Sequence, residues 1–286
     1  MSTIFDDRPC ALGEGPLWHP ERKQLFWFDI VGTRMLSQKD GEAREWLFDE
    51  HVSAAGWVDR DTLILASETG LWKFYLETEE QEYLCSLEAD NPVTRSNDGR
   101  ADPWGGFWIG TMGKNAEPKA GAIYRYFDGE LRKLVPDVTI SNAICFDKAR
   151  GCAYYTDTVT KLVMRQAVDA ESGWPVGKAE VYLDLNADGL NPDGAVVDAV
   201  GNVWIAQWGA ARVAAYDPDG NFLKAVAVGG QHSSCPAFGG DDLTTLLVTS
   251  AREGIDEKTL AEAPENGMVF AIDNVAQGVA EPRVIL

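Results

Sequence analysis

Residues 142–147 read NAICFD, a small polar start followed by largely apolar positions and a closing Asp. Related stretches recur along the chain, and the six copies are EGPLWH at 14–19, AAGWVD at 54–59, NDGRAD at 97–102, NAICFD at 142–147, DGAVVD at 193–198 and PAFGGD at 236–241. Their last residues stand 40, 43, 45, 51 and 43 positions apart. This is close to the period of four-stranded propeller blades. The repeat therefore predicts six similar structural units.

The segments that follow each copy predict how a unit is built. After a turn comes a short apolar run rich in strand formers, at 25–29, 63–66, 107–111, 153–157, 203–206 and 246–250. These runs are typical of buried strands, and the more polar alternating segments beyond them, such as 122–126 and 213–216, are typical of outer strands. We therefore predict an all-β chain, a six-bladed β-propeller with four-stranded blades around a central channel, and a single domain over residues 1–286.

Two segments fall outside the repeat. Residues 255–265, IDEKTLAEAPE, contain Leu, Ala and Glu and end near a Pro, which favours a helical turn inserted in the last blade over a charged surface loop. Ile4 and Phe5 precede the first unit. We expect them to supply an outer strand to the last unit and so to close the ring.

The charge of the chain narrows its possible partners. Lys and Arg number 25 against 45 Asp and Glu, a formal net charge of −20, which repels nucleic acid and anionic membrane surfaces. A divalent cation or a neutral small molecule suits this surface better. The start, MSTIFDDRPC, lacks the basic and apolar regions of a signal peptide, so we expect a cytoplasmic protein. No large apolar stripe demands a partner, which leaves the oligomeric state open and favours a monomer.

The five cysteines are odd in number and contain no Cys-x-x-Cys pair. This count argues against a disulfide framework and against a thiolate metal site. We expect reduced thiols that are mostly buried.

Counting back five residues from the end of each copy selects one position per unit, namely Glu14, Ala54, Asn97, Asn142, Asp193 and Pro236. Equivalent positions of the innermost strands surround the axis of a propeller, so these side chains are expected to form a ring at one end of the channel. Four of the six carry oxygen donors that suit Ca²⁺, Mg²⁺ or Mn²⁺ and tolerate Zn²⁺ or Fe²⁺. Each residue alone could instead cap a turn, but neighbouring buried acids favour a bound cation.

In the order and spacing of its motifs the chain resembles the gluconolactonase/regucalcin family, also called senescence-marker-protein and luciferin-regenerating-enzyme-like propellers. The motifs are GEGPLW at 13–18, RSNDG at 95–99, GTM at 110–112, SNA at 141–143, PDG at 192–194 and SAREG at 250–254. The resemblance implies a six-bladed propeller with one divalent metal on Glu14, Asn142 and Asp193, and substrate contacts at Arg95 and Asn97. Animal regucalcins carry a substrate-contacting Glu after the GTM motif. Here GKN follows at 113–115, which is more similar to bacterial sugar lactonases.

The predicted activity is hydrolysis of a sugar lactone, an aldono-1,4- or 1,5-lactone, to the aldonic acid in carbohydrate metabolism. The metal, whether Ca, Zn, Mn, Mg or Fe(II), acts as Lewis acid and Asp193 as general base. Asp98, next to Asn97, and Asn115 are further substrate-binding candidates. Lys114 and Arg252 join Arg95 as candidates for receiving a sulfonate, phosphate or carboxylate on the lactone.

Two other functions remain open from the sequence. The same metal site could hydrolyse organophosphates or other esters, since fold and metal do not fix the substrate. A calcium-binding propeller without catalysis would also carry a ring of acids. Motifs for other chemistries are absent: the chain contains no Gly-x-Ser-x-Gly, no His-Glu-x-x-His and no Walker loop, and its three histidines are scattered.

Overall fold

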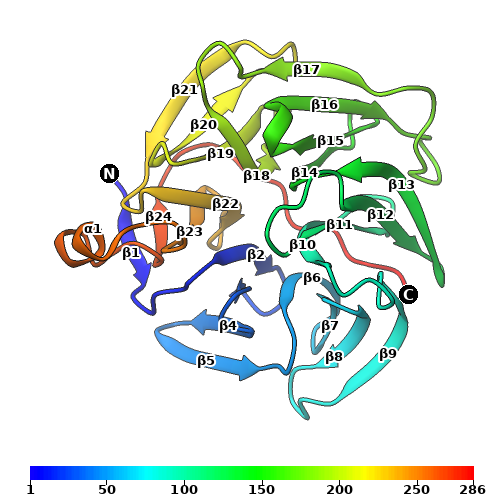
Figure 1. Cartoon of the computed structure of the whole chain (residues 1–286), viewed down its shortest axis with the longest axis horizontal. Coiled ribbons are helices and arrows are strands. Elements are labelled where there is room, and N and C mark those ends of the chain that lie inside the picture. The colour runs from blue at the N-terminus through cyan, green and yellow to red at the C-terminus, as the bar shows by residue number, and fades with distance from the viewer.

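A computed structural model describes all 286 residues and consists of six four-stranded sheets arranged in a ring (Figure 1). Within each sheet, hydrogen bonds join antiparallel neighbours. The predicted all-β class and the six-bladed propeller are confirmed. Each recurring stretch lies largely on an innermost strand, and the apolar run after it forms most of the second strand of the same blade.

The first five blades each use four consecutive strands. Blade 1 contains β2 Gly13–His19, β3 Gln24–Asp29, β4 Arg34–Lys39 and β5 Glu42–Leu47. Blade 2 contains β6 Val52–Asp59, β7 Thr62–Ser67, β8 Gly70–Tyr75 and β9 Gln81–Ser86. Blade 3 contains β10 Thr94–Ala101, β11 Phe107–Gly113, β12 Gly121–Phe127 and β13 Glu130–Val138. Blade 4 contains β14 Ser141–Asp147, β15 Cys152–Asp157, β16 Leu162–Ala167 and β17 Glu180–Asp184. Blade 5 contains β18 Asn191–Val197, β19 Val203–Trp208, β20 Arg212–Tyr216 and β21 Phe222–Ala227.

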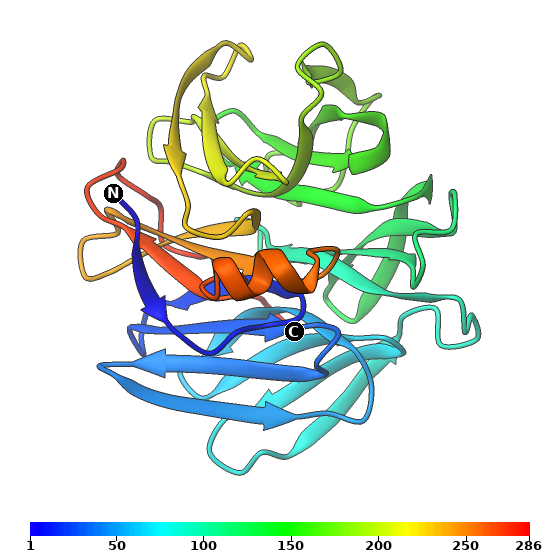
Figure 2. The same ribbon diagram turned by 60° about the vertical axis from the view of Figure 1, so that its left-hand side comes forward.

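The sixth blade joins the two ends of the chain. It contains β22 His232–Gly239, β23 Thr245–Ala251 and β24 Val269–Ile272, and its outer strand is β1 Thr3–Asp6, which pairs antiparallel with β24. This confirms the expected closure by the N-terminal segment. The short helix α1 Glu257–Glu262, capped by the Asp256 side chain, confirms the predicted helical turn. Figure 2 shows α1 beside β1 on the outside of this blade.

The apolar core is divided among the spaces between blades. The six clusters of buried apolar side chains lie mainly between two neighbouring blades; Leu25 and Trp27 of blade 1, for example, lie with Leu247 and Val269 of blade 6. Outer strands such as β5 and β21 are mostly exposed. Because each blade buries its two faces against its neighbours, the innermost strands are left to present polar side chains to the channel.

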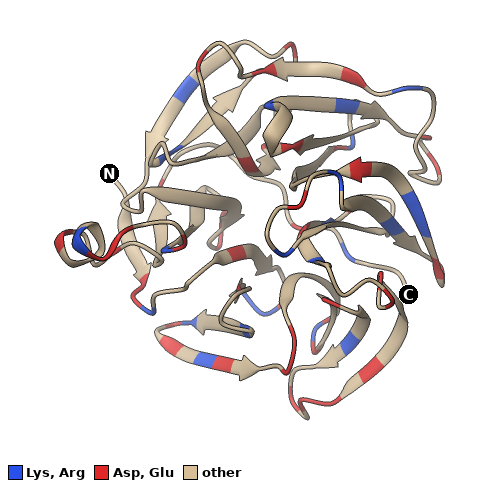
Figure 3. Ribbon diagram, in the orientation of Figure 1, with Lys and Arg blue, Asp and Glu red and all other residues tan.

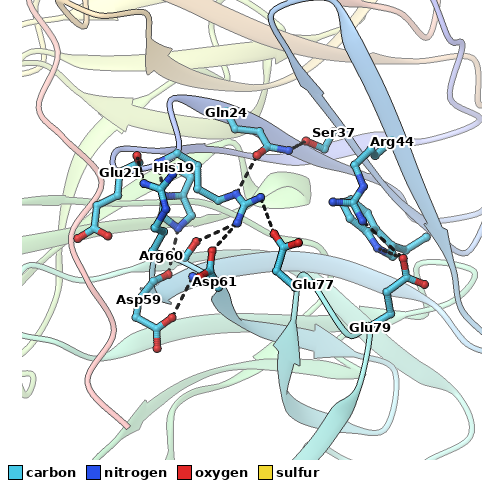
Figure 4. Close-up of polar contacts among 12 residues, drawn as sticks. His19, Glu21, Gln24, Ser37, Arg44, Asp59, Arg60, Asp61, Glu77 and Glu79 are labelled. Atoms are coloured by element: carbon cyan, nitrogen blue, oxygen red, sulfur yellow. Dashed lines mark hydrogen bonds and ion pairs between the residues drawn. The ribbon is translucent and has the colours of Figure 1, made fainter.

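Polar contacts add to this packing at the edge between blades 1 and 2 (Figure 4). The guanidinium of Arg22 donates to Gln24 at 3.0 Å, to Asp61 at 2.6 Å and to Glu77 at 3.0 Å. His19 contacts the carbonyl of Asp59 at 3.1 Å. Residues from the turn of one blade therefore hold the next blade at a fixed angle.

Every innermost strand loses its pairing register near the same end. The breaks lie between Glu14 and Leu17, Val52 and Ala54, Ser96 and Gly99, Asn142 and Cys145, Pro192 and Ala195, and Ser233 and Pro236. Such β-bulges leave residues unpaired and change the direction of their side chains. We call these six interruptions the hub breaks.

The hub breaks correct the assumption that the ring positions share one register. Glu14 and Asn142 are the last paired residues before a hub break, whereas Asn97 and Asp193 are the first unpaired ones. In blade 6, Pro236 already lies beyond the break, and Ser233 and Ser234 take the two hub places. A count along the sequence could not detect this shift because the breaks fall at different distances from the closing residue.

The last residues, 278–286, cross the other end of the hub, and we call them the strap. In Figure 1 the strap runs in red across the centre of the ring. The Trp57 indole donates to the carbonyl of Glu281 at 2.8 Å, and Val284 pairs with Trp57 through backbone atoms at 2.8 Å. The Glu281 carboxylate forms a buried ion pair with Arg100 of β10. The strap thereby connects separate blades at this end.

The structure also describes the state of the cysteines and the length of the helices. All five cysteines are free thiols, and four of them are buried, as expected. Neither the helix α1 nor any other helix combines the length and the apolar character that a membrane crossing requires.

Candidate active site

A cavity of about 440 Å³ opens at the end of the hub opposite the strap. Fourteen residues line it: Leu12, Glu14, Arg95, Asn97, Met112, Lys114, Asn115, Ala116, Ile140, Asn142, Thr158, Asp193, Trp208 and Glu253. They come from all the blades except blade 2 and from the connections between strands. The size is within the range of cavities that bind small molecules.

The structure brings the three predicted metal ligands to this one cavity. Glu14 of β2, Asn142 of β14 and Asp193 of β18 all line it, and each is at least 95 % buried, with exposed fractions of 5 %, 3 % and 4 %. Their positions follow from the hub breaks, which turn both paired and first unpaired side chains toward the axis. Residues 179 positions apart in the chain thus share one wall.

Burial and neighbouring negative charges raise the pKa values of both carboxylates of this group. Burial raises the pKa of Glu14, and the charge of Asp98 raises it further. Burial also raises the pKa of Asp193, and the charges of Glu14 and Asp98 add to the effect. No basic side chain donates a hydrogen bond to either group; Glu14 accepts only a long bond of 3.3 Å from the Gly15 amide. Two buried acids without a cationic partner favour protonation or a bound cation.

A chain of hydrogen bonds orients the amides beside these acids. The Asn142 amide nitrogen donates to the Thr158 hydroxyl at 2.9 Å, and Thr158 in turn donates to the carbonyl of Pro192 at 2.8 Å. The Asn97 amide nitrogen donates to the Asn142 oxygen at 3.2 Å. These contacts assign the oxygen of Asn142 to the side that faces Asn97 in the cavity and fix it there.

Arg95 is a buried cation of the cavity whose charge acts on Glu14. Its Nη1 donates to the Asn97 oxygen at 2.8 Å and to the carbonyl of Ser96 at 2.9 Å, while its Nε and Nη2 donate to no protein group. Burial lowers its pKa, and the negative charges of Glu253 and Glu14 oppose that shift. A guanidinium held on one side and free on the other can donate to an oxygen of a bound molecule.

The other two predicted substrate-binding residues, Asp98 and Asn115, lie in different surroundings from Arg95 and Asn97. Asp98 is buried, but it does not line the cavity; its carboxylate accepts a hydrogen bond from the Ile144 amide of blade 4 at 2.7 Å. Burial raises the pKa of Asp98 to about 6. Asn115 stands at the exposed rim of the cavity, where its amide donates to Glu117 at 3.0 Å.

The two additional basic candidates have partners within the protein. The Lys114 ammonium lines the cavity and forms an ion pair with Glu68, which also contacts His51 at 2.6 Å. Arg252 donates to the carbonyls of Asn266 and Pro264 at 2.9 and 3.0 Å and does not line the cavity. Arg95 therefore remains the cavity's arginine with free donors.

Sequence reasoning missed several wall residues. Trp208, Thr158, Ile140 and Glu253 lie at strand ends or in connections outside the recurring stretch. Trp208 stacks on His232 with ring centroids 4.3 Å apart. Glu253 falls within the SAREG motif, which was a partial signal of a role at the site. Nothing in the pattern of residues indicated that its side chain lines the cavity.

The donor set fits a hard divalent cation. The structure contains no group of three or more His, Cys, Asp and Glu side chains arranged to hold a metal. In this cavity the two carboxylates of Glu14 and Asp193 are accompanied by the amide oxygen of Asn142, which is already oriented. Two carboxylates and an amide, with room for other oxygen ligands, match the preferences of Ca²⁺ and related ions.

Several known proteins are similar to this chain over nearly its whole length. The 6-deoxy-6-sulfogluconolactonase of Pseudomonas putida is 34% identical over 96% of this chain and 95% of its own length. The L-arabinolactonase of Azospirillum brasilense is 33% identical over 99% of this chain and 95% of its own. A crystal structure of a calcium-binding protein, regucalcin, from Agrobacterium tumefaciens is 37% identical, covers 100% of this chain and 98% of its own, and superimposes with a TM-score of 0.98.

The names of these relatives agree with the enzyme class predicted from the sequence. The model of the SMP-30/Gluconolactonase/LRE-like region matches residues 12–252, a span that includes every predicted site residue. Because this match extends over most of the chain and the relatives align from end to end, the protein belongs to the SMP-30/Gluconolactonase/LRE-like family.

Proposed function

We propose that the protein is a metal-dependent sugar lactone hydrolase. The observation that carries this proposal is the pair of buried carboxylates, Glu14 and Asp193. They share a cavity with the oriented amide of Asn142 and with the guanidinium of Arg95, whose Nε and Nη2 have no protein acceptor. Relatives that align over nearly the whole chain are named as lactonases acting on different sugars, which supports the reaction class rather than one substrate.

Glu14, Asn142 and Asp193 would hold the metal. A divalent cation bound there supplies Lewis-acid polarisation of the lactone carbonyl and compensates the two acids. The similar protein from Agrobacterium is described as calcium-binding, which makes Ca²⁺ the first ion to test. Zn²⁺, Mn²⁺, Mg²⁺ and Fe²⁺ suit the same donors.

Asp193 acts as the general base. Its carboxylate accepts no hydrogen bond from another side chain, so one oxygen is available to take a proton from the attacking water. In the metal-free protein, burial and the neighbouring acids raise the pKa of Asp193. Water oxygen adds to the carbonyl carbon, the ring carbon–oxygen bond then breaks, and the ring oxygen receives a proton to leave as the hydroxyl of the aldonic acid.

Arg95 and Asn97 position the lactone. The free Nε and Nη2 of Arg95 are suited to donate to a ring or hydroxyl oxygen, and Asn97 holds the guanidinium in that orientation at 2.8 Å. The apolar walls formed by Leu12, Met112 and Trp208 restrict water around the reacting carbonyl. Orientation and exclusion of water are the two contributions of these residues to the rate.

The charges in the cavity favour a lactone without an anionic substituent. Lys114 is paired with Glu68, Arg252 is directed elsewhere, and the Glu253 carboxylate adds negative charge to the wall. A neutral lactone enters this environment without penalty. The product is an anion, so the net charge of −20 favours its release.

The direct test follows acid release from a panel of neutral and anionic aldonolactones, each with the metal supplied and with a chelator. We expect turnover of at least one neutral lactone that stops when the metal is removed and returns on addition of Ca²⁺, Zn²⁺ or Mn²⁺. Metal-independent rates with every lactone would contradict the proposal. Comparable turnover of paraoxon-like esters would favour a broader esterase, and metal binding without any turnover would favour a scaffold.

A further inference from the structure

Two hub breaks share an unusual backbone conformation. In β2 the residue after Glu14 is Gly15, with φ of 55°, and in β14 the residue after Asn142 is Ala143, with φ of 56°. Both residues lie in the left-handed region. In both strands this turn directly follows a side chain that lines the cavity, so it sets the direction of a predicted metal ligand.

In β2 the local sequence encodes the turn. Gly15 has no Cβ and adopts positive φ without strain. The next residue is Pro16, which has no amide hydrogen, so no donor is left without an acceptor where the pairing breaks. Glu14 is therefore aimed by residues of its own strand.

In β14 the local sequence opposes the same turn. Ala143 carries a Cβ that disfavours positive φ. Ile144 has an amide hydrogen that the hub break leaves without a partner in the sheet, and both residues are fully buried. An amide buried without an acceptor is strongly unfavourable. Something outside β14 must stabilise this backbone.

Asp98 of the neighbouring blade supplies the missing acceptor. Its Oδ2 accepts the Ile144 hydrogen bond at 2.7 Å. The adjacent residue, Asn97, donates to the Ser141 carbonyl at 2.9 Å and to the Asn142 side chain at 3.2 Å. Two consecutive residues of β10 thus contact β14 on either side of the left-handed turn.

We propose that Asp98 is a positioning residue, not a substrate ligand: by accepting the Ile144 amide hydrogen bond it holds Ala143 in the left-handed conformation that directs the Asn142 side chain into the cavity. Asp98 thus stabilises in β14 the left-handed turn that Gly15 and Pro16 stabilise in β2. The inference rests on the proposed function only in taking Asn142 as a metal ligand; the effect on the backbone is independent of it.

The experiment compares D98A in two backgrounds, the native chain and the A143G/I144P variant. This variant places the Gly–Pro sequence of β2 at the corresponding positions of β14. Both use the full chain, and Ca²⁺ and Zn²⁺ affinities are measured separately by titration calorimetry. In the native background we expect D98A to weaken metal binding at least about tenfold, as is common for partners of metal ligands. In the A143G/I144P background no amide needs an acceptor, so D98A should change the affinity less than about twofold.

Conservative and control variants separate positioning from charge and from general stability. D98N keeps an oxygen that can accept the Ile144 amide, so its metal affinity should stay within about threefold of the native value. Asp198, a buried aspartate that accepts the Val200 and Asn202 amides at 3.1 and 2.9 Å, contacts the strap. D198A should lower the free energy of unfolding and leave metal affinity unchanged.

Several outcomes would overturn the inference. They are unchanged metal affinity in D98A, equal losses in D98N and D98A, and an undiminished loss in the A143G/I144P background. If D98A alone does not fold, D98N and the D98A/A143G/I144P variant, in which residue 144 has no amide hydrogen, keep the inference testable. If the native protein binds no metal and turns over no lactone, the proposed function fails; a crystal structure of D98A then tests positioning alone, through the φ angle of residue 143 and the direction of Asn142.

Discussion

Buried acids stand at both ends of the hub, but their partners differ. At the strap end, Glu281 forms an ion pair with Arg100, and both side chains are largely buried. At the cavity end, Glu14 and Asp193 have no basic side chain bonded to them. Figure 3 shows acidic residues distributed over the whole ring, so their number does not mark a site. The acid at the strap end has a basic partner within the chain, whereas the two acids at the cavity end, which we propose bind a cation, have none.

The largest expected effect comes from removing one acid at the cavity end. D193N should lower kcat for the lactone by about 10² to 10⁴-fold, because the amide cannot accept the proton of the attacking water. Its metal-free form should be at least as stable as the native protein, since a repulsive charge is lost. Initial rates at saturating metal and urea unfolding measure the two effects. A variant that keeps native turnover would show that Asp193 is not the base.

At the strap end, we expect the removal of one charged side chain to lower the free energy of unfolding. R100L leaves the Glu281 carboxylate buried without a partner, and loss of one member of such a pair costs about 3 to 5 kcal/mol of unfolding free energy. R100L/E281L should recover most of this loss, because two apolar side chains replace the whole pair. Urea unfolding of both variants measures the difference. If R100L were as stable as the native protein, the proposed contrast between the two ends would be wrong.

Added metal should stabilise the protein through the cavity end alone. At a free concentration 100 times its Kd, a ligand that binds only the folded state raises the unfolding free energy by about 2.7 kcal/mol. We expect this increase in the native chain and in R100L/E281L, and none in E14Q/D193N. Chelator titrations followed by urea unfolding provide the measurement. An equal increase in E14Q/D193N would place the metal elsewhere.

The last prediction concerns the change in stability per unit of pH. Glu14 has an ordinary pKa of 4.5 and a raised pKa in the folded protein, so the folded state holds its proton more tightly. Its contribution to stability is present below about pH 4.5 and is lost as the pH rises toward the folded-state pKa. In chelator, the stability of E14Q should therefore fall less steeply with pH than that of the native chain, by at most about 1.4 kcal/mol per pH unit. Parallel pH profiles between pH 5 and 8 would contradict this.

The recurring stretch was sufficient to predict the blades because strand pattern and spacing are local properties. It also led to the hub through Glu14, Asn142 and Asp193. It failed for Pro236, since a pairing break that leaves one or two residues unpaired is not written in the spacing. It failed in a different way for Asp98, whose neighbour Asn97 lines the cavity while its own side chain contacts blade 4.

Residues outside the repeat could not be placed from the sequence for a related reason. Thr158 and Trp208 reach the cavity from strand ends and connections, whose path depends on how neighbouring blades dock. Lys114 and Arg252 look alike as basic candidates in the sequence, and only their partners distinguish them. Side-chain direction at a blade boundary is therefore a tertiary property.

The hub breaks have a consequence for how such a protein can change. All six inner strands are interrupted near the same depth, and the cavity-lining side chains of Glu14 and Asp193 at these breaks lie outside the apolar clusters between the blades. Ser233 and Ser234 of blade 6 are places of this kind that carry only hydroxyls. A new donor at either place would replace a hydroxyl that donates to the carbonyl of Arg212 or Gly13, at the cost of that one contact. The same architecture can in this way carry different chemistry.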